Sequence, residues 1–210
     1  MDRLLDLRSQ QSAFNTVEAC KIDLKTHQPL KRTPTGVTLH QTACWYSVAP
    51  YQLEAAKGDE VLARHRRALG VHAHITAMRH GKFVVAYDPD VYVNHGDLLN
   101  SEDVGLEHEG LYDYDGKPID LPRGVDVGEI IEAGRAALEW LVSNVPTLRY
   151  VHAHRQSRRA PKRAKQNDPG RRIFQEVGIE WGVKKLGLSI EPDRVLGSGL
   201  ALPRSWYVQP

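Results

Sequence analysis

The sequence predicts a single-domain α/β fold in which helices flank a central mixed β-sheet. Short apolar runs that are typical of strands alternate along the chain with segments whose apolar residues recur at helical spacing. The 210 residues, of which 41% are hydrophobic, suffice to bury one core. No internal repeat or flexible linker divides the chain, so a single domain is expected.

Strands are expected where apolar residues run together between turn-forming residues. GVTLH (36–40), DVGLEHEG (103–110) and LRYVHAH (148–154) each predict a buried strand. HAHITAMRHGKFVVAYD (72–88) places His80 and Gly81 between two apolar runs, which is the pattern of a β-hairpin. These segments provide the strands of the expected sheet.

Helices are expected in three places. Apolar residues recur at helical spacing over 52–69. Asp126 precedes Glu129 by three residues, which is a capping-box spacing, and it opens a helix that Pro146 ends. A third helix is expected to open at Asp168-Pro169-Gly170 and to close near Gly187.

The chain carries nearly equal numbers of basic and acidic residues, so its net charge does not indicate a strongly charged partner. Lys and Arg number 28 against 26 Asp and Glu, so the formal charge is +2 and neither nucleic acid nor a membrane is expected as a partner. The opening MDRLLDLRSQQSAF carries charges within its first three residues and has no apolar core. We therefore expect a chain without a signal peptide, cytoplasmic as synthesised. Its oligomeric state is left open.

Three of the ten histidines, His40, His74 and His154, lie at or near the ends of predicted strands. Side chains held at strand ends can meet although they are far apart in sequence. One explanation is a metal site made of His40, His154 and Asp168, because two imidazoles, one carboxylate and an open position are typical of catalytic zinc. The alternatives are hydrogen-bonded structural histidines and, for Asp168, an N-cap of the following helix.

Four stretches, in this order along the chain, resemble one family: GVTLHQTA, VHAHITAMRHGKFVVAYDPD, VNHGDLLNSEDVGLEHEG and VHAHRQSRRAPKRAKQNDPG. The sequence is similar there to the amidase-2 family, which contains the zinc-dependent N-acetylmuramoyl-L-alanine amidases and is related to the peptidoglycan recognition proteins. The resemblance spans roughly residues 35–185. It implies that fold, with zinc as the cofactor and peptidoglycan or muropeptides as the partner.

The resemblance also implies a role for each matching residue. His40, His154 and Asp168 correspond to the zinc ligands, and Glu107 corresponds to the general base. Asn94, His95 and Arg158 are expected to contact the substrate. Ala73 stands where one branch of the family has a tyrosine, so this chain resembles the branch that uses a glutamate and an aspartate. Glu107 keeps a second interpretation as a salt-bridge partner.

The segment between His154 and Asp168 departs from the family pattern because it is longer and more basic. Many active members have a lysine two residues before the aspartate, where this chain has Gln166. We assign the catalytic cation to Lys165, with Arg158 and Arg163 as alternatives. The basic run 157–165 is also open to three interpretations: a solvated loop, a contact for anionic cell wall, and a nucleic-acid contact.

The predicted function is hydrolysis of the amide between the muramoyl lactyl group and L-alanine. The alternative is a peptidoglycan-binding protein on the same fold without catalysis. We expect an N-terminal extension over 1–34, the amidase-like catalytic domain over 35–187 and a C-terminal tail over 188–210. An endolysin-like enzyme that reaches the cell wall after lysis or delivery and a recycler of soluble muropeptides both fit these expectations.

Overall fold

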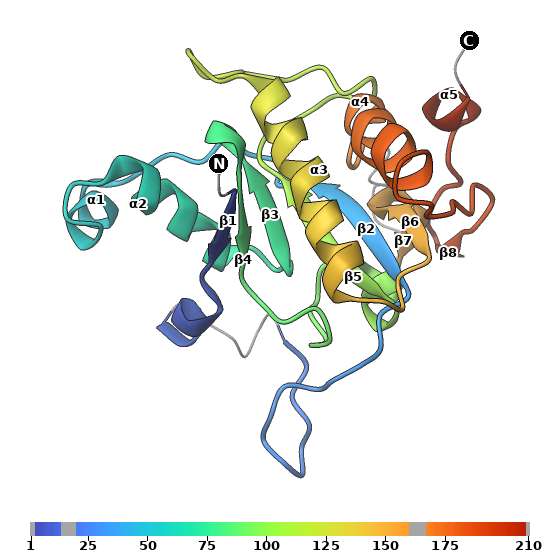
Figure 1. Ribbon diagram of the computed structural model, residues 1–210, viewed down its shortest axis with the longest axis horizontal. Helices are drawn as coiled ribbons and strands as arrows, with labels where there is room; N and C mark the ends of the chain where they lie inside the picture. The colour runs from blue at the N-terminus through green and yellow to red at the C-terminus, as the bar shows by residue number, and fades with distance from the viewer. Residues whose placement is uncertain (1–2, 14–19, 160–166, 209–210) are drawn as a thin grey trace.

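The computed structural model describes residues 3–13, 20–159 and 167–208, and its centre is a six-stranded mixed β-sheet (Figure 1). The strand order is β1-β4-β3-β5-β2-β6. Neighbouring strands pair in parallel except β3 and β4, which form the predicted antiparallel hairpin. The strands are β1 (Leu4–Asp6), β2 (Gly36–Gln41), β3 (Ile75–Met78), β4 (Lys82–Val85), β5 (Asp103–His108) and β6 (Tyr150–Ala153). The expected α/β fold with a mixed sheet is confirmed.

The remaining elements are mostly short helices. The α-helices are α1 (Pro50–Ala55), α2 (Glu60–Arg66), α3 (Val127–Asn144), α4 (Arg171–Ile173) and α5 (Arg204–Tyr207). The 3-10 helices are η1 (Arg8–Ala13), η2 (Arg67–Gly70), η3 (Arg79–Gly81), η4 (Asp97–Ser101) and η5 (His154–Gln156), and η6 (Phe174–Val183) is a π-helix. A second small sheet pairs β7 (Ser157–Arg158) with β8 (Leu196–Gly197) in parallel. In the described part of the chain, no helix is long and apolar enough to span a bilayer.

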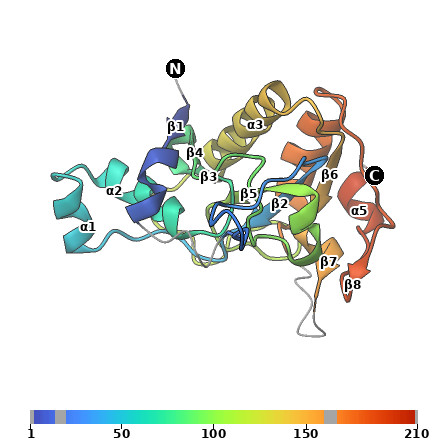
Figure 2. The same ribbon diagram turned by 90° about the horizontal axis from the view of Figure 1, so that it is seen from below.

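One face of the sheet is covered by α3 and η6, which lie side by side across the central strands (Figures 1 and 2). The main core lies between these helices and the strands and includes Leu39, Leu106, Leu138 and Val177. A second apolar cluster, around Met78 and Val84, lies on the other side of the hairpin. Burial of these side chains holds the strands in place at the edge where the site lies.

Two predicted helices differ from the sequence-based expectation. The predicted helix over 52–69 is interrupted, because Lys57 and Gly58 adopt positive φ angles of 53° and 83°. Asp59 then caps α2 by accepting a hydrogen bond from Leu62 N at 2.9 Å. The helix expected from Asp168 begins instead at Arg171 and widens into the π-helix η6.

The cap of α3 is confirmed, whereas the capping box is not. Asp126 accepts a hydrogen bond from Gly128 N at 2.7 Å, so it caps the helix as expected. The carboxylate of Glu129 accepts a hydrogen bond from His80 N at 3.0 Å and ties the helix to the hairpin turn. His80 has a φ of 67°, and this turn conformation directs its backbone N–H to the helix.

The chain outside 35–187 contributes to the same body. β1 forms an edge of the sheet by pairing in parallel with β4. Trp206 of α5 is fully buried and belongs to the main core. We keep the division into an extension over 1–34, a catalytic domain over 35–187 and a tail over 188–210 as a proposal.

A buried ion pair between Arg79 and Glu109 joins the hairpin to the end of β5. Glu109 is fully buried and also accepts a hydrogen bond from Tyr46 N at 3.0 Å. We expect Glu109→Gln to lower the free energy of unfolding by about 3–5 kcal/mol, because it leaves a buried guanidinium without its counter-charge. Urea denaturation measures this loss.

The matched control for that substitution is Glu60→Gln. Glu60 pairs with Arg64 at the surface, where the glutamate side chain is 63% exposed. An exposed pair of this kind contributes less than about 1 kcal/mol. Equal effects of the two substitutions would contradict a stabilising role for the buried pair.

Candidate metal centre and catalytic site

The central strands have one apolar and one polar face. Val37 and Leu39 of β2 point toward the helices, since a Cβ added at Gly178 of η6 would lie 3.3 Å from Leu39 Cδ1. Thr38 and His40 alternate with them and therefore point to the other face. The segment GVTLHQ thus forms a strand with one apolar and one polar face, and the candidate metal ligand His40 lies on the polar face.

The structure brings together the three residues predicted as metal ligands. His40 is near the end of β2, and His154 directly follows the neighbouring strand β6. Their Nδ1 atoms are 2.8 Å apart, and His154 Nδ1 lies 2.9 Å from Asp168 Oδ2. All three residues are at most 5% exposed, and one ligand atom from each lies within 4.8 Å of the others. Parallel neighbours that end at one edge explain why residues 114 positions apart meet.

Asp168 does not cap the helix that follows it, so the capping interpretation is wrong. Its Oδ1 accepts a hydrogen bond from Gln41 N at 2.9 Å, and its Oδ2 faces His154. The N-cap of α4 is Gly170, which makes no side-chain capping bond. The carboxylate is thus held by the end of β2 and directed at the histidine pair.

Glu107 stands beside this cluster. It is the register partner of His40 on the parallel strand β5, so both side chains lie on the polar face. Its Oε1 lies 3.9 Å from His40 Nδ1, and the residue is 9% exposed. A carboxylate at this distance can accept a proton from a molecule held next to the histidine nitrogens.

Of the residues predicted to contact substrate, Asn94 and His95 line a cleft beside the cluster and Arg158 does not. Asn94 is exposed and lines a cleft of about 460 Å³ beside the cluster. The lining residues of this cleft are Asn94, His95, Asp97, Asn100, His154 and Arg159. Arg158 lies on β7 and is absent from that lining. Lys165 lies outside the described residues.

His95 is buried, with both ring nitrogens close to protein atoms. Its Nε2 lies 2.7 Å from Asp103 O, and its Nδ1 lies 3.1 Å from His40 Nε2. Burial lowers the pKa of His95 to about 3, which keeps the imidazole neutral at physiological pH. These contacts place the His95 ring next to His40, one of the residues predicted as a metal ligand.

The donor set fits a zinc ion. Two imidazole nitrogens and a carboxylate oxygen are ligands that zinc prefers, and three protein ligands leave a position for water or substrate. The Nδ1 atoms of His40 and His154 approach each other at hydrogen-bond distance with a carboxylate alongside. One cation would satisfy all three groups, so the residues present suit the metal that the sequence resemblance implies.

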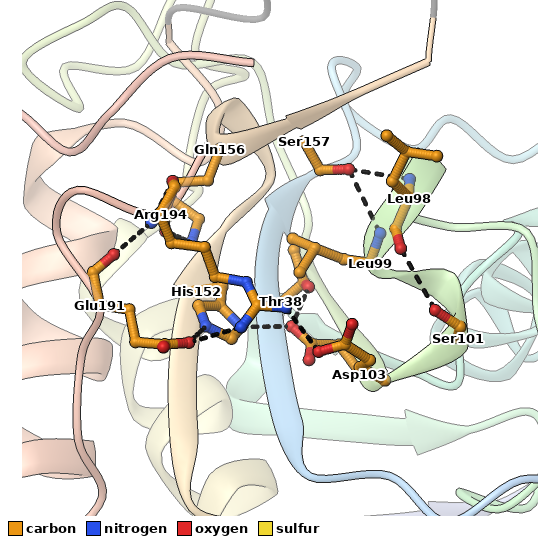
Figure 3. Close-up of polar contacts among 12 residues, drawn as sticks. Thr38, Leu98, Leu99, Ser101, Asp103, His152, Gln156, Ser157, Glu191 and Arg194 are labelled. Atoms are coloured by element: carbon orange, nitrogen blue, oxygen red, sulfur yellow. Dashed lines mark hydrogen bonds and ion pairs between the residues drawn. The ribbon is translucent and has the colours of Figure 1, made fainter. Parts of the chain in front are cut away.

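A second polar network lies on the same face and links the sheet to the C-terminal segment (Figure 3). Asp103 Oδ2 accepts a hydrogen bond from Thr38 Oγ1 at 2.6 Å and lies 2.7 Å from His152 Nδ1. His152 Nε2 lies 3.0 Å from Glu191 Oε2. Burial opposes a charge on His152, but the hydrogen bonds to the two carboxylates outweigh it and raise the pKa of this histidine.

His74, also predicted near a strand end, contacts backbone atoms through both ring nitrogens and has a structural role. Its Nδ1 accepts a hydrogen bond from Gly105 N at 3.0 Å, and its Nε2 lies 2.8 Å from Val91 O. Burial holds the pKa of His74 well below its ordinary value, and electrostatic interactions with the neighbouring His95 and Arg32 act in the same direction. A ring that accepts at Nδ1 while it donates from Nε2 must be neutral.

Part of the pH dependence of stability follows from His74. Because its folded-state pKa is lowered, its contribution is present above pH 6.5 and is lost as the pH falls below that value. We expect His74→Gln to show a shallower loss of unfolding free energy between pH 7 and pH 5, by up to about 1.4 kcal/mol per pH unit. Urea denaturation at several pH values measures the slope.

The control is His72→Gln, on the loop just before β3, which should keep the wild-type slope. An unchanged slope in His74→Gln would contradict the assignment of this pH dependence to His74.

Comparisons with known proteins find similar solved structures. No protein-family model and no curated protein matches the sequence. The solved structure of N-acetylmuramoyl-L-alanine amidase LysC from Clostridium intestinale is 12% identical, with a TM-score of 0.47, and the match covers 86% of this chain and all of that one. Bumblebee PGRP-SA is 15% identical, with a TM-score of 0.49, and the match covers 91% of this chain and 99% of that one.

A third similar structure is a mutant of Drosophila PGRP-LB in complex with tracheal cytotoxin. It is 17% identical to this chain, with a TM-score of 0.47, and the match covers 89% of this chain and 96% of that one. The structures to which this chain is similar thus include both an amidase and peptidoglycan recognition proteins.

Three residues that line the cleft, Asp97, Asn100 and Arg159, were not predicted from the sequence. Asp97 Oδ2 lies 3.8 Å from His154 Nε2, and Arg159 lines the cleft. A signal for Asp97 was its place two residues after His95, in the segment already assigned to substrate binding. Arg159 stands inside a basic run, where no pattern favours one cation over its neighbours.

Proposed function

We propose that the protein is a zinc-dependent N-acetylmuramoyl-L-alanine amidase that acts on peptidoglycan or muropeptides. The observation that carries this proposal is the convergence of His40 Nδ1, His154 Nδ1 and Asp168 Oδ2 beside the carboxylate of Glu107. A metal centre with an adjacent carboxylate suits hydrolysis of an unactivated amide. The substrate class follows from the four stretches that resemble the amidase-2 family.

His40, His154 and Asp168 would hold the ion. When bound, zinc acts as a Lewis acid that activates water near neutral pH and polarises a carbonyl. Glu107 then takes up a proton at Oε1 as water adds to the amide carbon, and it returns that proton to the nitrogen of L-alanine as the carbon–nitrogen bond breaks. The low exposure of Glu107 limits competition from bulk water.

The cleft beside the cluster offers groups that suit the substrate. Asn94 can form hydrogen bonds with glycan or peptide amides, and Arg159 can pair with the carboxylates of the stem peptide. Both residues line the same cleft as His154. Lys165 stays the proposed catalytic cation on the basis of its place in the sequence.

A binding protein without catalysis is the second candidate. The observation that favours it is Gln166, which stands where many active members of the family have a lysine. Such a protein would use the same cleft and leave the amide intact. The complete set of ligand candidates together with Glu107 favours the enzyme.

The test is incubation of the zinc-loaded protein with a soluble muropeptide that carries an L-alanine stem peptide and, separately, with intact sacculi. We expect release of a peptide with a free L-alanine amino group, detected by mass spectrometry. Cleavage of the soluble substrate alone would assign a recycling role, and cleavage of sacculi would assign a lytic one. Binding to both substrates without any cleavage would overturn the enzyme in favour of the second candidate.

A further inference from the structure

The ring of His95 has a fixed place above β5. A Cβ added at Gly105 would come within 2.5 Å of His95 Cγ, so the imidazole lies directly against the glycine backbone. The residue is 7% exposed, and its ring makes an edge contact with the ring of His40, with centroids 5.2 Å apart. His95 lines the cleft but therefore has little freedom to reorient its ring.

The hydrogen bonds of His95 define which nitrogen carries its proton. Nε2 lies 2.7 Å from the carbonyl oxygen of Asp103, and a carbonyl oxygen can only accept, so Nε2 donates. The other nitrogen of the neutral ring, Nδ1, is then an acceptor. It lies 3.1 Å from His40 Nε2, which must donate to it.

The same reasoning extends to His40. Because His40 Nε2 carries the proton, His40 Nδ1 of the neutral ring keeps its lone pair. That nitrogen is the atom that lies 2.8 Å from His154 Nδ1 in the cluster. The chain of contacts from Asp103 through His95 thus presents the ligand atom of His40 to the proposed metal centre.

The backbone around His95 is also held. Asn100 Oδ1 accepts a hydrogen bond from His95 N at 2.9 Å. Ser157 Oγ accepts hydrogen bonds from Leu98 N at 2.8 Å and Leu99 N at 3.2 Å, which ties η4 to β7 (Figure 3). The segment that carries His95 is therefore held by Asn100 of η4 and, through η4, by Ser157 of β7.

We propose that His95 is a positioning residue of the metal centre, which selects the Nδ1 atom of His40 as the metal ligand. This inference rests on the proposed zinc site and replaces the expected contact between His95 and substrate. Groups that hold a ligand histidine through its second nitrogen typically change metal affinity by about 10–100-fold when they are removed. His95 acts on affinity through His40, without touching the metal.

Two substitutions distinguish the contributions of the two ring nitrogens of His95. His95→Asn places an amide oxygen near the position of Nδ1 and can still accept from His40, whereas His95→Gln reaches toward Asp103 and lacks that acceptor. We expect His95→Gln and His95→Leu to weaken zinc binding about 10–100-fold and His95→Asn to stay within about 10-fold of wild type. Competition with a fluorescent zinc chelator measures these affinities, with His72→Gln as the control outside the cluster.

The outcomes distinguish this inference from the proposed function. A wild-type chain that binds no zinc overturns both. Zinc binding by the wild type with the same affinity in all three variants overturns the positioning role alone, as does an Asn variant that is as weak as the Leu variant. Circular dichroism shows whether each variant is folded.

A second measurement needs no variant at this position. Long-range proton–nitrogen NMR spectra of the zinc-loaded protein with ¹⁵N-labelled histidine report the protonated nitrogen of each ring. We expect His40 to carry its proton on Nε2 and His95 to carry its proton on Nε2. A His40 ring protonated on Nδ1 would overturn the inference, whatever the affinities of the variants. His40→Gln assigns the resonance.

Discussion

Glu107→Gln is expected to lower kcat/KM for muropeptide hydrolysis by about 10²–10⁴-fold. The amide keeps the size of the carboxylate but cannot take up a proton at Oε1, which lies 3.9 Å from His40 Nδ1. Zinc content should stay at the wild-type level because Glu107 is not among the three converging ligand candidates. Steady-state assays together with metal analysis measure both quantities on one preparation.

The matched control is Glu102→Gln, which precedes the same strand and forms an ion pair with Arg194 at 2.6 Å. Its activity should remain close to wild type, because the pair lies away from the cluster. If Glu107→Gln retained full activity with zinc bound, the general-base role would be wrong and another residue would have to move the proton.

Asp168→Asn is expected to weaken zinc binding by more than about 100-fold, a larger loss than outer contacts usually cause. The asparagine can still accept a hydrogen bond from Gln41 N, so the end of β2 keeps its partner while the negative charge is lost. Activity should fall in parallel with zinc occupancy. Chelator competition measures the affinity, and circular dichroism verifies the fold.

Asp115→Asn is the control for the loss of one negative charge. Asp115 pairs with Arg171 at the surface, where its side chain is 60% exposed. Wild-type zinc affinity is expected for this variant. Equal affinities of Asp168→Asn and the wild type would show that the carboxylate is not a ligand and would leave it as a structural partner of β2.

Five of the six strands of the central sheet were predictable because their signals are local, whereas β1 (Leu4–Asp6) was not predicted. GVTLH, DVGLEHEG and LRYVHAH carry apolar runs that only a buried strand explains well, and the hairpin turn is marked by His80 and Gly81. The break between α1 and α2 was less visible, because Lys57 adopts a positive φ that lysine rarely takes. The π-helix η6 packs on β6 and α3, and no spacing rule in the sequence indicated its wider turns.

The part of the candidate site that lies at the ends of neighbouring parallel strands was predictable from the sequence. His40 and His154 lie at the ends of β2 and β6, and the parallel pairing of these two strands brings them together. The role of His95 was not predictable, because it depends on which nitrogen faces Asp103 O and which faces His40. Hydrogen-bond direction is a property of the folded geometry, so the sequence indicated only that His95 lies nearby.

The most direct test of the metal centre is the zinc content of the purified wild-type chain, measured by inductively coupled plasma mass spectrometry. We expect about one zinc ion per chain, retained through dialysis and removed by a strong chelator. Folded protein that holds no zinc, even after refolding with the metal supplied, would contradict the proposed metal centre.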